Sequence, residues 1–270
     1  MQNIKRLIPN LLTAGNLVGG IMAIIFTLTG RIDLAPWCIF ISAIFDFLDG
    51  FAARLLKVQN ELGKQLDSLA DMVTFGVAPG IIVFSILGFK MNVLNLLSLG
   101  SATAARDNSM ILTIFGSDSF VMNNIAFIGF IIPVFALFRL AKFNLDTRQT
   151  SSFIGLPTPA MTLFFAVIPI LVLKSGDADF HFWMTTKVLL NPDFLVVSSI
   201  IMSILMVVEL PLFALKFKTF KWKGNEIRFI FLTICIGLFA TLLFWSIPLI
   251  IILYIILSVI NNVIHKTNEI

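Results

Sequence analysis

Charged residues are scarce in this chain of 270 residues. Lysine, arginine, aspartate and glutamate together make up 13% of it, and the mean hydropathy is +0.99. A soluble domain of this length carries roughly a quarter charged residues. The shortage excludes an ordinary soluble domain and indicates a protein that crosses a membrane several times.

Cysteine and histidine are equally rare, with two of each. Cys38 and Cys235 lie inside apolar runs and form neither a disulfide pattern nor a zinc-binding pattern. His181 and His265 are too far apart in the sequence to suggest a histidine metal site. We also find no internal repeat and no low-complexity tract. Any metal chemistry must therefore use oxygen ligands.

Long apolar runs dominate what is present. A membrane-spanning helix needs about 20 mostly apolar residues. The runs of suitable length are 11–29, 35–56, 66–88, 121–142, 157–174, 194–215, 228–245 and 247–264. The third is the least regular, because Asp67, Asp71 and Pro79 interrupt it. We expect an all-α polytopic membrane bundle of about eight spans.

The basic residues are divided unevenly between the two sides of such a bundle. With the N-terminus in the cytoplasm, 14 of the 19 lysines and arginines fall on the inner side and 5 on the outer side. Positively charged flanks favour the cytoplasm. The bias predicts a protein of the inner membrane with both its N- and C-termini in the cytoplasm. Its basic inner side would face anionic lipid headgroups. A nucleic-acid partner is not needed to explain the net charge of +4.

Four of the fifteen acidic residues lie within two consecutive apolar runs. They are Asp46 and Asp49 in the second run, and Asp67 and Asp71 in the third. Helical spacings of i, i+3 and i, i+4 place each pair on one face of its helix. A short link makes the two helices antiparallel neighbours, so we expect four carboxylates to converge near the cytoplasmic surface. Ionisable groups at membrane depth are costly and usually functional.

Converging carboxylates need cations to neutralise them. Oxygen ligands favour hard divalent ions such as Mg²⁺, Mn²⁺ or Ca²⁺ over zinc, and four carboxylates suit a two-metal site that acts on a phosphate chain. Gly50, Ala53 and Gly63 leave room for a nucleotide, and Arg54 supplies a planar fork for phosphate. The alternative is that these acids only pair with Arg54, Lys57 and Lys64 to anchor helix ends.

Residues 46–71 read D-F-L-D-G-F-A-A-R, eight residues, then G-K-Q-L-D-S-L-A-D. This segment resembles the complete signature of the CDP-alcohol phosphatidyltransferase family, D-x2-D-G-x2-A-R-x8-G-x3-D-x3-D. The resemblance covers about residues 1–216. It implies a six-helix catalytic core (1–216) that is usually dimeric. A basic cytoplasmic loop and two additional C-terminal spans would then make up residues 217–270.

The resemblance also implies roles for individual residues. Two divalent cations, Mg²⁺ or Mn²⁺, would be held by Asp46, Asp49, Asp67 and Asp71. Asp71 would also be the base that takes the acceptor's hydroxyl proton. The CDP and its diphosphate would be framed by Gly50, Ala53, Arg54 and Gly63.

Other segments resemble the branch of the family that transfers to serine. They are P-N-L-L-T-A-G-N-L-V-G-G at 9–20, S-L-A-D-M-V-T-F-G-V-A-P-G at 68–80, R-L-A-K-F-N at 139–144 and F-I-G-L-P-T-P-A at 153–160. Within the third segment, Lys142 replaces the branch's more usual arginine, which keeps the charge but loses bidentate geometry.

Two groups of residues outside the signature have two interpretations each. Thr13 and Asn16 either contact the nucleotide or serve as capping and packing residues. Arg139, Lys142 and Asn144 either bind the acceptor, whose carboxylate requires a cation, or follow the positive-inside rule alone. Arg139 is our first choice for the carboxylate.

The sequence thus predicts transfer of a phosphatidyl group from CDP-diacylglycerol to L-serine, by in-line displacement assisted by two metals. The same chemistry with glycerol 3-phosphate, an inositol phosphate or choline is the alternative within the family. From another class, a small-molecule transporter also places acids at membrane depth.

Overall fold

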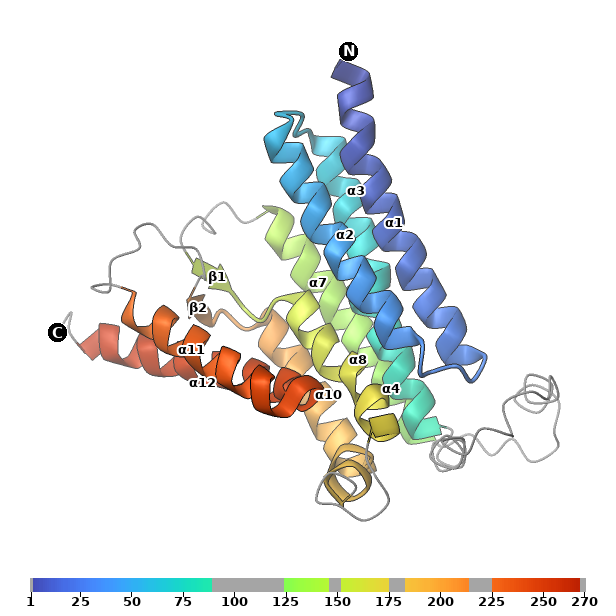
Figure 1. Ribbon diagram of the computed structural model, residues 1–270, viewed down its shortest axis with the longest axis vertical. Coiled ribbons are helices and arrows are strands. Elements are labelled where there is room, and N and C mark those ends of the chain that lie inside the picture. The colour runs from blue at the N-terminus through green and yellow to red at the C-terminus, as the bar shows by residue number, and fades with distance from the viewer. Residues whose placement is uncertain (1, 89–123, 146–151, 175–182, 214–224, 268–270) are drawn as a thin grey trace.

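The structure is a computed structural model that describes residues 2–88, 124–145, 152–174, 183–213 and 225–267 (Figure 1). Within these ranges the chain is almost entirely helical, which confirms the predicted all-α membrane bundle. Each of the eight apolar runs coincides with a helix, or with a helical stack, over most of its length. Most of the basic loop expected at 217–225 lies outside the described residues.

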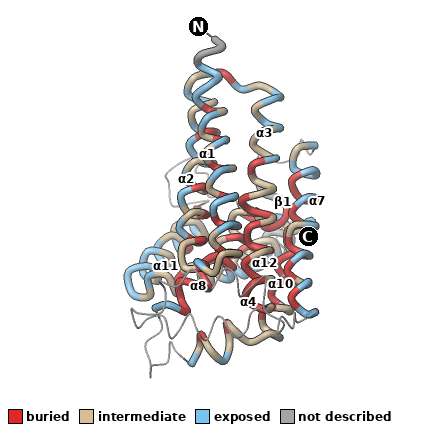
Figure 2. The backbone as a smooth tube through the Cα atoms, turned by 90° about the vertical axis from the view of Figure 1, so that its right-hand side faces the viewer, coloured by how far each residue is buried: buried red, intermediate tan, exposed pale blue. Residues whose placement is uncertain are grey.

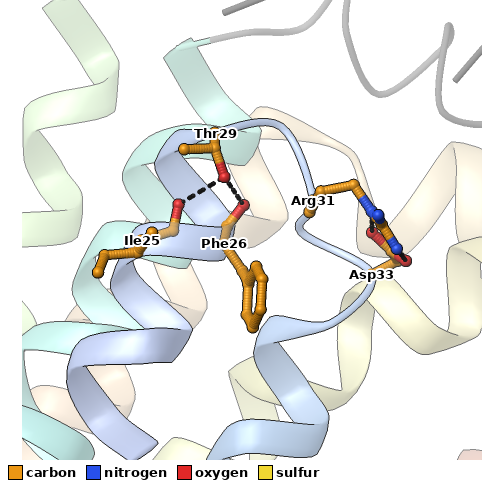
Figure 3. Close-up of polar contacts among 5 residues, drawn as sticks. All are labelled: Ile25, Phe26, Thr29, Arg31 and Asp33. Carbon is orange, nitrogen blue, oxygen red and sulfur yellow. Dashed lines mark hydrogen bonds and ion pairs between the residues drawn. The ribbon is translucent and has the colours of Figure 1, made fainter. Parts of the chain in front are cut away.

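Helices α1 (Gln2–Leu28) and α2 (Ala35–Leu55) form an antiparallel hairpin. Figure 3 shows the connection between them, where Thr29 Oγ1 donates to the carbonyl oxygen of Ile25 at 2.8 Å. Gly30 follows with φ of +79°, a left-handed conformation that suits glycine. Arg31 and Asp33 then form an ion pair at 3.1 Å. Because the Arg31 side chain is exposed, this pair adds little stability.

The third run folds as a continuous stack of α3 (Glu61–Asp71), a π-helical segment η1 (Met72–Val77) and α4 (Ala78–Gly88). The side chain of Asn60 caps α3 by accepting a hydrogen bond from the Gly63 N–H at 2.7 Å. Pro79 has no N–H to donate to the Phe75 carbonyl, four residues earlier. The hydroxyl of Thr162, on α8 (Thr158–Lys174), donates to that carbonyl at 2.8 Å and compensates.

The core lies where α4 meets η2 (Asn124–Phe130), α7 (Ile131–Leu145), α8 (Thr158–Lys174) and α10 (Pro192–Val207). Figure 2 shows buried residues gathered in this half of the molecule, whereas the ends of α1 to α3 nearest the N-terminus are mostly exposed. Phe75, Ile82, Phe165 and Leu195 are completely buried. The exposed ends of α1 to α3 therefore project from a compact buried base.

A two-stranded antiparallel ribbon, β1 (Ser152–Ile154) with β2 (Pro211–Phe213), interrupts the helices. The predicted helical run to residue 215 was wrong at its end, since α10 stops at Val207 and Val208 is extended. Pro211 cannot donate a helical hydrogen bond, which is consistent with this early end. Gly155, with φ of +76°, lets the chain pass close to the carbonyl of Met206.

The last two expected spans are α11 (Glu226–Leu242) and α12 (Ser246–Thr267), joined by the short 3-10 segment η4 (Leu243–Trp245). In Figure 1 this hairpin runs crosswise to α1 and α2. Tyr254 donates its hydroxyl to the carbonyl of Phe213 at 3.0 Å, and Asn262 donates to that of Pro211 at 2.6 Å. The hairpin is thus tied to strand β2.

Four described segments are long and apolar enough to cross a membrane: Lys5–Leu28, Glu61–Gly88, Asn124–Leu145 and Glu226–Val263. Two shorter apolar helices, Thr158–Lys174 and Pro192–Val207, accompany them. The chain is therefore a multi-pass membrane protein. The number of eight crossings stays a prediction.

Candidate active site

Three of the four predicted carboxylates meet between α2 and α3. Asp46, Asp49 and Asp67 each offer an oxygen, and these oxygens lie within 4.8 Å of one another. Asp71 follows Asp67 by one helical turn, and its side chain interacts with that of Asp46. All four predicted acids therefore belong to one cluster, as the i, i+3 and i, i+4 spacings imply.

No basic side chain forms an ion pair with this cluster within the described residues, although the charge of Arg139 interacts with Asp71 at longer range. The ion pairs Arg31–Asp33 and Lys142–Glu209 do not include the cluster. Lys64 instead donates to the backbone carbonyl of Asn144 at 2.9 Å. The anchoring alternative, in which Arg54, Lys57 and Lys64 pair with the acids, is therefore not what the structure shows. Carboxylates grouped this closely fit a hard divalent cation.

Helix α1 contributes two side chains to the cluster. Thr13 Oγ1 donates to Asp49 Oδ2 at 2.6 Å, and Asn16 Nδ2 donates to Asp71 Oδ1 at 3.0 Å. Small residues on α1 allow this approach. A Cβ on Gly19 would collide with Ser42 of α2, and one on Gly20 would collide with Thr74 of η1. Gly19 and Gly20 are therefore packing positions between α1, α2 and η1.

A cavity of about 350 Å³ opens beside the carboxylates. Five of the six residues predicted to bind the nucleotide line it, namely Thr13, Gly50, Ala53, Arg54 and Gly63. At Gly50 an added Cβ would have no atom closer than 3.9 Å, so glycine there leaves the cavity open. Asn16 is completely buried and does not line the cavity.

Sequence reasoning missed several polar residues of this cavity. Arg6, Asn10 and Asn60 also line it. Asn10 lies in the 9–20 segment, and Asn60 stands three residues before Gly63, a spacing typical of a helix N-cap. These residues give the cavity cationic and amide groups beside its acids.

The predicted acceptor residues lie at the end of α7. Arg139 is buried, donates from Nε to the carbonyl of Leu156 at 3.0 Å, and stacks 5.3 Å from the ring centre of Phe143. It is close enough to Asp71 for their charges to interact. Lys142 pairs with Glu209 at 3.7 Å. Arg139, Lys142 and Glu209 line one small cavity.

Asn144 lies in a different setting. Its Nδ2 donates to Ser68 Oγ at 2.8 Å, and its carbonyl accepts from Lys64. Asn144 therefore joins α7 to α3, and it is not among the residues lining the small cavity.

Fold and site together define a class, a multi-pass membrane protein with a carboxylate cluster beside a nucleotide-sized cavity. A family comparison specifies that class further, because the CDP-alcohol phosphatidyltransferase profile matches residues 6–215. The chain belongs to the CDP-alcohol phosphatidyltransferase family and is an enzyme. The match ends before α11.

Curated relatives are similar over much of the same region. The CDP-diacylglycerol–serine O-phosphatidyltransferase of Helicobacter pylori is 29% identical over 198 residues, which cover 73% of this chain and 69% of the relative. Its namesake from Bacillus subtilis is 31% identical over 186 residues, covering 67% and 88%. The archaetidylserine synthase of Methanothermobacter thermautotrophicus is 27% identical over 154 residues, covering 56% and 53%.

Proposed function

We propose that this enzyme transfers the phosphatidyl group of CDP-diacylglycerol to L-serine, giving phosphatidylserine and CMP. The observation that carries the proposal is the carboxylate cluster beside a cavity lined by Gly50, Ala53, Arg54 and Gly63. The names of the three relatives described above support serine as the acceptor.

The carboxylates of Asp46, Asp49, Asp67 and Asp71 would hold two divalent cations, Mg²⁺ or Mn²⁺. Such cations neutralise a diphosphate and stabilise the charge that develops on a leaving phosphate. Closely grouped oxygen donors that form no ion pair among the described residues support this assignment. Arg54, with Thr13 and the glycines, would position CDP in the larger cavity. Asn16, which does not line this cavity, would act on nucleotide binding through its hydrogen bond to Asp71.

In the chemical step, the hydroxyl oxygen of serine attacks the lipid-side phosphorus of CDP-diacylglycerol. A new phosphorus–oxygen bond forms, the bond to the CMP oxygen breaks, and the hydroxyl proton passes to Asp71. Asp71 is supported in this role by its place between the cluster and Asn16. A covalent enzyme intermediate is not required, so the reaction is a single in-line displacement.

Arg139 would bind the carboxylate of serine, because a buried guanidinium is a strong partner for a carboxylate. Its burial and its nearness to Asp71 support this role. Lys142 would assist from the same small cavity, and Asn144 would act from the neighbouring end of α7.

The basic residues around the larger cavity, Arg6, Arg54 and Lys64, support a cytoplasmic position for the site. We place both termini in the cytoplasm and the acyl chains of the donor in the inner membrane. We also propose a homodimer, on the basis of the family resemblance alone.

Purified protein with CDP-diacylglycerol tests this function when serine, glycerol 3-phosphate, inositol phosphate and choline are offered separately. We expect CMP release and phosphatidylserine only with serine, and only with Mg²⁺ or Mn²⁺ present. Release with another acceptor would support the proposed transfer reaction but contradict serine as the acceptor. Absence of CMP with every acceptor would overturn the proposal and favour a transporter.

A further inference from the structure

Helix α1 donates two hydrogen bonds to the carboxylates of the cluster, and these bonds bear on the orientation of the carboxylates as well as on nucleotide binding. Thr13 and Asn16 lie one helical turn apart, and each donates to a different carboxylate of the cluster. The partners come from different elements, Asp49 from α2 and Asp71 from the end of α3. One face of α1 therefore contacts both helices that carry the signature, α2 and α3.

Burial limits what else these two side chains can contact. Asn16 has no exposed surface and Thr13 has 6%. A buried polar group costs free energy unless it is hydrogen-bonded. The Oγ1 of Thr13 carries a single proton and has two acceptors within reach, the Pro9 carbonyl at 3.1 Å and Asp49 Oδ2 at 2.6 Å. The shorter distance, to Asp49, is typical of a charge-assisted bond. Both donors are therefore directed at carboxylates.

Helix α1 is itself held at this position. The hydroxyl of Thr74 in η1 donates to the backbone carbonyl of Asn16 at 3.0 Å. Gly19 and Gly20 pack directly on Ser42 and Thr74, which leaves no room for larger side chains. A donor on a helix fixed at two points restricts the rotation of the carboxylate it contacts.

We propose that Thr13 and Asn16 are positioning residues, which fix the planes of the Asp49 and Asp71 carboxylates for divalent-cation binding. This inference rests on the proposed function, because it assigns the partners that orient the proposed ligands. Residues that orient metal ligands typically change metal affinity or activity by about 10- to 100-fold when removed. The chain offers a matched control in Thr27. It is also buried on α1, and its hydroxyl bonds only the Ala23 carbonyl of its own helix.

The experiment compares Thr13→Val, Thr13→Ser, Asn16→Leu and Thr27→Val in the full chain. Free Mn²⁺ is titrated by electron paramagnetic resonance without substrate, and CMP release is measured separately. Thr13→Val and Asn16→Leu should weaken Mn²⁺ binding and lower kcat by about 10- to 100-fold. In Asn16→Leu, whose residue does not line the larger cavity, the KM for CDP-diacylglycerol should change less than about threefold, as expected when only the carboxylate is affected. Thr27→Val should resemble the wild type, and Thr13→Ser, which keeps the hydroxyl, should restore Mn²⁺ binding relative to Thr13→Val.

Equal Mn²⁺ binding by Thr13→Val and Thr27→Val would overturn the inference. So would a raised KM for CDP-diacylglycerol with unchanged Mn²⁺ binding, because that result describes a nucleotide contact. Should Thr13→Val fail to fold, Asn16→Leu applies the same test at Asp71. Wild-type protein that neither binds Mn²⁺ nor releases CMP would overturn the proposed function itself. Normal wild-type activity with unaffected variants would overturn the positioning role alone.

Discussion

The helices α1 to α3 and the hairpin α11–α12 differ in their content of polar and charged side chains. Both belong to a membrane protein, yet α1 to α3 bury Thr13, Asn16 and Asp49 among one another. Residues 229–264, by contrast, contain no lysine, arginine, aspartate or glutamate. Ionisable groups at membrane depth persist where they perform work. The contrast indicates that chemistry belongs to the first region and structural support to the second.

The hairpin still makes specific contacts. Tyr254 packs with Phe213 and Phe231, and its hydroxyl bonds the end of strand β2. Apolar side chains such as Ile236 (70% exposed) face outward, as expected for a lipid-facing helix. The family match ends before this hairpin. Its contacts hold β2 in place and supply no group to the larger cavity among the described residues.

The largest expected effect is at the cluster. Asp67→Asn should lower CMP release about 1,000-fold, because a lost metal ligand removes several kcal/mol of charge stabilisation. Asp33→Asn is the control, since Asp33 pairs with Arg31 at the far end of the α1–α2 hairpin (Figure 3). It should retain wild-type activity within about twofold. Asp67→Asn protein with more than a tenth of the wild-type rate would contradict the metal assignment.

Arg139→Ala should affect the acceptor selectively. We expect the KM for serine to rise about 10- to 100-fold, because hydrogen bonds to charged groups contribute about 1.5–3 kcal/mol. The KM for CDP-diacylglycerol should remain within about threefold. Arg139→Lys should be intermediate, since it keeps the charge and loses the planar fork. An unchanged KM for serine in Arg139→Ala would remove Arg139 from the acceptor site.

Asn144→Ala and Ser68→Ala distinguish acceptor binding from a link between helices. Each removes the same hydrogen bond between α7 and α3. If Asn144 also contacts serine, only Asn144→Ala should raise the KM for serine, by about three- to tenfold. Steady-state kinetics of the two variants provide the comparison. Equal KM values would show that Asn144 only joins α7 to α3 and does not contact serine.

The smallest effect is expected in the hairpin. Tyr254→Phe removes one hydrogen bond to Phe213 and should lower stability by about 1 kcal/mol. Serine-dependent CMP release should stay within about twofold of the wild type at a temperature where both are folded. Thermal unfolding and activity are measured on the same preparation. A tenfold loss of activity would contradict the assignment of catalysis to α1 to α3 and of structural support to the hairpin.

Much of the fold could be predicted from the sequence, because the length of an apolar run is set by the membrane. All eight runs fall on helices, and the early end of α10 was the error. The ribbon β1–β2 was not predictable, since each strand has three residues and its partner lies more than 50 residues away. The π-helical segment at 72–77 likewise depends on packing against α8 and not on local periodicity.

The site was predictable where it depends on spacing along one helix. The signature places Asp46 and Asp49 on one face of α2, and the structure joins them with Asp67. The contacts of Thr13 and Asn16 could not be predicted, because they depend on how closely α1 approaches α2 and η1. That approach is set by Gly19 and Gly20 against Ser42 and Thr74, which is a tertiary contact.

Serine-dependent CMP release by Asp71→Asn protein tests the central claim most directly. The substitution keeps the size of the side chain and removes the oxygen that would take the hydroxyl proton. The account predicts folded protein whose release falls to the level measured without serine. Release at the wild-type rate would contradict the assignment of Asp71, and with it the placement of the reaction at the carboxylate cluster.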